Sequence, residues 1–186
     1  MKTLLKIIAI AIVLLGIEAN SFAQITINPS ASGTIVQTIT FTKQADLDFG
    51  NMAVTTTAGL CILDPMGGIP NRTGTLGVVL PAFIGTPTAA AFTVTGAAGE
   101  SFTITIPQIG IHIIHTLPVA TSDNMLVDTY TCSSTDNLAP DKWRMQLDVL
   151  TGDAIFYVGG TCHVSASQLA GYYTLASGFP VTVNYE

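Results

Sequence analysis

Apolar and polar side chains alternate along several segments of the chain. The alternation runs through residues 92–95, 101–106 and 181–186, and it occurs again at 35–42 and 143–149. Because successive side chains of an extended strand point to opposite faces, each segment predicts a strand with one buried and one exposed face. Threonines occupy much of the exposed face, and their branched Cβ favours extended backbone.

Two of these segments predict a specific set of core positions. The apolar face consists of Ile35, Ile39 and Phe41 at 35–42, and of Trp143, Met145, Leu147 and Val149 at 143–149.

Short stretches rich in Gly, Pro and Asp separate the predicted strands. They lie at 64–68, 85–87, 96–99, 151–153, 159–160 and 177–178. Many short strands with frequent turns are typical of a β-sandwich or β-barrel, so we predict an all-β fold. Residues 125–132 predict a further strand, followed by a surface loop through Asp136, Pro140 and Asp141. Only residues 165–170 look helical, over about one turn.

The N-terminus has the three parts of a secretory signal peptide. Lys2 and Lys6 precede an apolar run at 7–17, and the small residues Ser21 and Ala23 precede a cleavage point. As a helix that run spans only about 16 Å, too short for a bilayer core of roughly 30 Å. We therefore expect a chain that is exported and not stably inserted in a membrane after cleavage. Its expected parts are a signal peptide at 1–23, an extension at 24–34 and a β-sandwich domain at 35–186.

The amino-acid composition excludes one class of partner and two classes of structure. The 186 residues are 10% charged, with a net charge of −6 and 25 threonines between Thr26 and Thr182. A negative chain cannot neutralise phosphates, so nucleic acid is excluded as a partner. The Gly, Thr and β-branched content argues against a coiled coil, and the high apolar content argues against disorder.

Three cysteines, Cys61, Cys132 and Cys162, follow the predicted signal peptide. An exported protein meets an oxidising compartment, where one disulfide would leave one thiol over. Cys61 alternates with Leu63 and Cys162 with Val164, so both are predicted to face inward. They are either bonded or small buried hydrophobes, and the sequence leaves the pairing open.

Carboxylates suggest no catalytic site. Asp46 and Asp48 lie two apart on a predicted strand, where a solvated face explains them better than the cleft of a glycosidase. Asp123 and Asp136, with the asparagines that follow them, match no calcium-binding loop. The motifs of common hydrolases and phosphate-binding loops do not occur in the sequence. We expect no enzyme activity, no cofactor and no metal.

The histidines and aromatic residues predict neither a metal site nor a sugar-binding surface. His112 and His115 fall on opposite faces of a strand, so they do not predict a zinc site. Trp143 is predicted to be core, and only one of the adjacent Tyr172 and Tyr173 is expected to face outward. This is too little for a platform of aromatic rings that binds sugar.

Six motifs follow one another along the chain. They are ADLDFG at 45–50, LDP at 63–65 with Gly67-Gly68, AAFTVTG at 90–96, FTITIP at 102–107, VGGT at 158–161, and GF at 178–179 with VTVNY at 181–185. The series resembles the bacterial domain-of-unknown-function-4402 family over nearly all of the chain after the signal peptide. The resemblance implies an immunoglobulin-like antiparallel β-sandwich exported by Gram-negative bacteria, and it carries over no catalytic residues.

The layout is more distantly similar to chaperone–usher-type (spore-coat-U-like) pilin subunits, through residues 47–50 and the penultimate Tyr185. In such pilins a neighbour's N-terminal extension supplies a missing strand. This likeness implies self-association or assembly with other pilus subunits, and a periplasmic chaperone as partner. It identifies 24–34 as the donor strand, with Ile25, Ile27 and Tyr185 as the assembly residues.

We therefore expect a structural protein that passes through the periplasm to the cell surface or the medium. The expected role is a pilus or fimbria subunit in cell adhesion that assembles by strand addition. The alternative is a free-standing secreted sandwich module that binds a glycan or a partner protein.

Overall fold

The computed structural model describes residues 27, 29–33, 35, 37–66, 71–81, 85–117, 124–175 and 177–186. The chain divides into two units, Met1–Ile35 and Val36–Glu186. The predicted signal peptide and Ile25 lie outside the described residues. In the first unit the described residues are all exposed, and none belongs to a strand.

In the described part of the second unit, the regular secondary structure consists of strands, which are joined by turns and loops. Their bounds are β1 (Thr40–Ala45), β2 (Ala53–Asp64), β3 (Asn71–Val79), β4 (Ala90–Thr95), β5 (Ser101–Thr105), β6 (Ile111–His115), β7 (Met125–Cys132), β8 (Asp136–Ala139), β9 (Lys142–Gln146), β10 (Asp153–Val164), β11 (Tyr173–Thr174) and β12 (Thr182–Tyr185). The described residues contain no helix that could cross a membrane. The predicted all-β class is confirmed.

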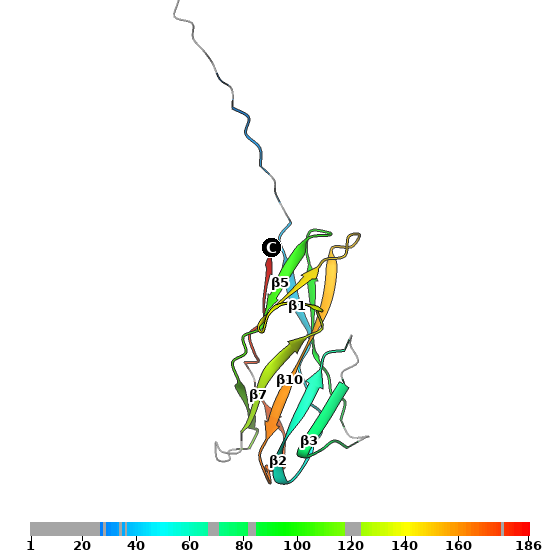
Figure 1. Ribbon diagram of the computed structural model, residues 1–186, viewed down its shortest axis with the longest axis vertical. Coiled ribbons are helices and arrows are strands. Elements are labelled where there is room, and N and C mark those ends of the chain that lie inside the picture. The colour runs from blue at the N-terminus through cyan, green and yellow to red at the C-terminus, as the bar shows by residue number, and fades with distance from the viewer. Residues whose placement is uncertain are drawn as a thin grey trace, which may run out of the picture. The chain divides into compact units, whose positions relative to one another are not determined.

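The strands form an antiparallel sandwich of two sheets (Figure 1). In the larger sheet the order is β1-β4-β10-β7-β6-β11, with β2 beside β10 and β3 outside β2. The smaller sheet has the order β12-β5-β9-β8. The inward faces of the segments at 92–95 and 101–106 are as predicted, because Val94 and Ile104 are fully buried. The exposed face predicted for 101–106 is wrong at Thr103, which is buried.

β10 joins the two halves of the larger sheet. Residues 153–158 pair with β4, and residues 160–164 pair on the same flank with β2. The turn predicted at Gly159-Gly160 is therefore wrong, because both glycines lie inside β10, where one neighbour gives way to the other. A Cβ at Gly159 would lie 2.0 Å from the carbonyl oxygen of Leu63. The glycine thus permits close approach of β2 and does not bend the chain.

The start of the first strand also differs from the prediction. Ile35 is 99% exposed and lies outside the strand, which begins at Thr40 opposite Thr95. β4 ends at Thr95, so the chain before Thr40 has no continuing partner in that ladder. Phe41 does take its predicted place, and its ring stacks on Phe92 at 5.2 Å.

The segment after β7 contains a hairpin where a surface loop was predicted. β8 pairs with β9, so that Asp136 lies opposite Arg144, and the chain turns at Pro140 and Asp141. Trp143 is buried, as predicted. Val149 is not, because β9 ends at Gln146 and Val149 belongs to the following turn.

The helical turn predicted at 165–170 is wrong. Residues 166 and 167 form a turn, and Ser167 has a φ of 54°. A residue in the left-handed region interrupts a right-handed helix. The backbone N–H of Gln168 donates to the carbonyl of Ser165 at 3.2 Å, which closes the tight turn.

Candidate functional site

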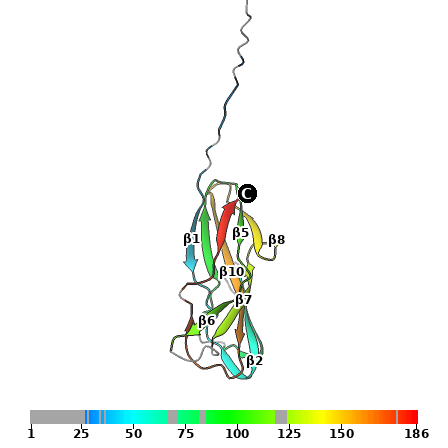
Figure 2. The same cartoon turned by 90° about the vertical axis from the view of Figure 1, so that its left-hand side faces the viewer.

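In the described part of the chain, both sheets of the sandwich have edge strands that are paired on one side only, and β1 and β12 are two of them. Among the described strands, β1 is paired only with β4, and β12 is paired only with β5. Figure 2 shows β1 (blue) and β12 (red) toward the same flank of the sandwich. An open edge presents backbone N–H and C=O groups that can pair with another strand. We call β1 and β12 together the open flank.

Burial of the inward-facing side chains falls toward the open flank. Val94 and Ile104, in strands with neighbours on both sides, are fully buried. Phe41 in β1 and Val183 and Tyr185 in β12 also pack against the core, but they are only half-buried. The core is therefore less completely covered at the open flank than at the centre of either sheet.

Tyr185 anchors the end of β12. Its hydroxyl oxygen accepts a hydrogen bond from the backbone N–H of Ala97 at 2.7 Å. A Cβ on Gly96 would lie 2.1 Å from that oxygen, so the position requires the glycine's missing side chain. At the same end, the N–H of Glu186 donates to the carbonyl of Ser101 at 3.2 Å. Tyr185 thus holds the open strand in place from the inner side.

Ile27, the second predicted assembly residue, is 80% exposed. Ile35 in the same unit is 99% exposed. Both are large apolar side chains without cover, in a stretch whose described residues form no strand. The structure thus leaves Ile27 exposed in the extension and places Tyr185 on the inner side of the open flank.

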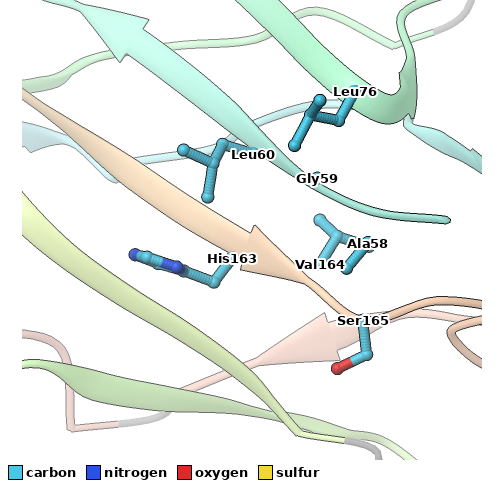
Figure 3. Close-up of a pocket in the computed structure, with 7 residues that line it drawn as sticks. All are labelled: Ala58, Gly59, Leu60, Leu76, His163, Val164 and Ser165. Carbon is cyan, nitrogen blue, oxygen red and sulfur yellow. The ribbon is translucent and has the colours of Figure 1, made fainter.

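A shallow apolar hollow lies on the outer side of β2 and β10 (Figure 3). Leu76, 86% exposed with a φ of 53°, borders it where the β2–β3 register shifts. The lining residues are Ala58, Gly59, Leu60, Leu76, His163, Val164 and Ser165. They include no Trp, Tyr or Phe on which a sugar ring could stack.

The side chain of His163 at this hollow is hydrogen-bonded to the Asp128 carboxylate, with 2.8 Å between Nε2 and Oδ1. Sequence reasoning missed this pair, because the two residues lie on β10 and β7 and meet only through the register of those strands. The neighbouring Cys162 is fully buried and therefore points to the opposite face of β10. The histidine and that thiol do not form a nucleophile–base pair.

The predicted inward orientation of Cys61 and Cys162 is confirmed, since both are fully buried. All three cysteines are free thiols in the structure. Burial raises the pKa of Cys61 to about 11 and that of Cys162 to about 12. It also raises the pKa of Cys132, which is half-buried, to about 11. Thiols of this kind are weak nucleophiles at neutral pH.

The carboxylates serve local structure. Asp46 and Asp48 are both exposed, as predicted, but they do not lie on a strand, because β1 ends at Ala45 and Asp48 makes only an isolated bridge to Thr88. The Asp48 carboxylate accepts from the N–H of Gly50 at 2.7 Å, which stabilises the turn where Gly50 has a φ of 65°. Within the described ranges, no three His, Cys, Asp or Glu side chains gather to hold a metal ion.

The prediction that His112 and His115 lie on opposite faces of a strand, here β6, is also confirmed. His112 is exposed, and His115 is buried. The N–H of Leu117 donates to Nδ1 of His115 at 2.9 Å, and Nε2 lies 3.3 Å from the carbonyl oxygen of Ala170. Since Nδ1 accepts, Nε2 carries the hydrogen and donates to Ala170. The ring is thus a structural contact between β6 and the chain before β11.

The family model "Domain of unknown function (DUF4402)" matches residues 39–185. The chain therefore belongs to this family, which confirms the resemblance seen in the motifs. No curated protein and no solved structure matches the chain.

Proposed function

We propose that this member of the DUF4402 family is an exported structural protein of the cell surface, a pilus- or fimbria-like subunit in cell adhesion. Subunits assemble by strand addition: the extension at 24–34 of one copy, or of another pilus subunit, pairs with the open flank of the next. A periplasmic chaperone covers the same flank before assembly.

The observation that carries the proposal is the half-burial of Phe41, Val183 and Tyr185 beside two open strand edges. A strand laid along this flank would satisfy free backbone groups and cover apolar surface in one step. Extended peptides gain affinity from the backbone bonds and specificity from alternate side chains. Ile25 and Ile27 have the required spacing of two.

Two further features support a structural role. Only 10% of the 186 residues are charged and the net charge is −6, so neighbouring copies repel one another weakly. Ile27 is 80% exposed and is available to a partner. The alternative, a free-standing module that binds a glycan or a protein, would use surfaces such as the hollow of Figure 3 and the exposed Tyr172.

Extraction of the protein from producing cells tests the proposal. Under mild conditions without heating, we expect a ladder of multimers on gel electrophoresis that collapses to monomer on boiling. Deletion of residues 24–34 should abolish the ladder, and so should the double variant Ile25→Asp/Ile27→Asp. Thr26→Asp is the matched control, because it places a charge in the same segment on the opposite side of an extended strand. A monomer from the wild type, or a ladder that survives the deletion, would refute strand addition through this extension.

A further inference from the structure

We propose that Cys61 and Cys162 form a disulfide between β2 and β10 as the chain folds, and that Cys132 stays a free thiol. In the cell the inference rests on the export in the proposed function but not on strand addition, and it resolves the pairing that the sequence left open.

The register of the sheet brings the two sulfur-bearing residues together. β2 and β10 are antiparallel neighbours, and Cys61 lies directly opposite Cys162. Opposed residues of such a pair have Cα atoms about 4.5–5.5 Å apart. Disulfides span Cα separations of roughly 4.4–6.8 Å, so the backbone already has a suitable spacing.

Both side chains also point to the same face. Each is fully buried, and cross-strand partners share a face of the sheet. On its other flank Cys61 lies opposite Gly74, which has no side chain, and Cys162 lies opposite Val127. The side chain that Cys61 meets across the ladder is therefore that of Cys162.

Cys132 is excluded as a partner by its place on β10's other flank. It lies opposite Val158, four residues before Cys162 along the strand. At about 3.3 Å per residue, this separates it from Cys162 by roughly 13 Å along the sheet. A disulfide cannot bridge Cα atoms more than about 7 Å apart without backbone movement.

The bond forms by exchange with a disulfide-bearing oxidant, such as oxidised glutathione or a protein disulfide. The Cys61 thiolate attacks one sulfur of the oxidant, which gives a mixed disulfide and releases one thiolate. The Cys162 thiolate then attacks the Cys61 sulfur and releases the second. The two cysteines lose two electrons and two protons, the oxidant gains the electrons, and its two thiolates take up the protons.

The timing follows from burial. In the folded chain neither sulfur is accessible, and burial keeps the pKa of both thiols far above neutrality. Exchange therefore takes place as β2 pairs with β10, before the core closes over the two sulfurs. Once formed, the bond is shielded from reductants by the same packing.

Refolding in a redox buffer tests the pairing. The full chain, reduced and unfolded, is refolded in mixed reduced and oxidised glutathione, quenched in acid, alkylated while unfolded, and mapped by mass spectrometry. We expect one alkyl group per chain, at Cys132, and a linked peptide pair that contains Cys61 and Cys162. Three alkylated cysteines, or a link that includes Cys132, would overturn the proposal.

Variants with one cysteine replaced by alanine test the pairing further. Cys132→Ala should keep the link and leave no thiol to alkylate. Cys61→Ala and Cys162→Ala should each leave two alkylated thiols and no link. A link between Cys132 and the remaining cysteine in either variant would contradict the separation argued above. The wild-type map decides the pairing even if one of these variants does not fold.

Discussion

The hydroxyl oxygen of Tyr185 accepts a hydrogen bond from the backbone N–H of Ala97 at 2.7 Å, across 88 positions of sequence. It ties the last strand, β12, to the turn between β4 and β5. β12 has a strand neighbour on one side only among the described residues, so this bond is a main constraint on its free end.

Tyr185→Phe removes that bond and little else. The part-buried N–H of Ala97 then lacks its protein partner, so we expect the free energy of unfolding to fall by about 1 kcal/mol. Urea denaturation of wild type and variant measures the difference. Tyr172→Phe is the control, because Tyr172 is 68% exposed, and its change should stay within about 0.5 kcal/mol. Equal losses in the two variants would show that the bond adds no stability.

His115→Ala should destabilise the protein by about 2 kcal/mol, since it leaves the part-buried N–H of Leu117 without its acceptor and opens a space in the core. It also removes the edge-to-face contact of His115 with Tyr173, at 4.9 Å between ring centroids.

His112→Ala is the matched control on the same strand. His112 is exposed, so its loss should change stability by less than about 0.5 kcal/mol. Thermal and urea unfolding of both variants give the comparison. The interpretation of His115 as a structural contact would be wrong if the two variants were equally stable.

The Asp148 carboxylate should make the free energy of unfolding depend on pH in the acid range. Its carboxylate accepts from the N–H groups of Thr151 and Leu150, at 2.9 and 2.8 Å, and these bonds lower its pKa below the ordinary 3.8. Because the folded pKa is the lower one, the unfolded chain binds the proton first as the pH falls. The stabilisation is thus complete above 3.8 and is lost as the pH drops through the folded value.

Asp148→Asn tests this dependence. The wild type should be more stable than the variant at neutral pH, and the difference should shrink below pH 3.8. Urea denaturation over a pH series gives the curve. A difference that stayed constant, or grew in acid, would contradict the role assigned to the turn.

Local alternation predicted β4, β5 and β12, but it did not predict the full extent of β2 and β10. In β5, which pairs with β12 and β9, the alternation at 101–106 predicted the inward face correctly, since Phe102 and Ile104 are fully buried. It did not predict that Thr103 on the opposite face is buried as well. The same reasoning failed at Ile35, where a local alternation continues but the neighbouring strand does not.

Features of the fold that depend on the register between strands could not be predicted from the sequence. Gly159-Gly160 looks like a turn in sequence, but in the sheet it is the place where β10 exchanges one neighbour for another. The facing of Cys61 and Cys162, and the pair formed by Asp128 and His163, likewise follow from strand pairing over long sequence distances. The local alternation within one strand does not specify which distant strand lies beside it.

Hydrogen–deuterium exchange at β12 tests strand addition most directly. The amides of Thr182–Tyr185 are compared between isolated monomer and multimer, with those of Ser101–Thr105 in β5 as the internal reference. The account predicts that backbone N–H groups of β12 facing away from β5 exchange at least about tenfold more slowly in the multimer, because a donor strand accepts their hydrogen bonds. The reference amides should remain slow in both forms. Unchanged exchange at β12 on assembly would contradict the account.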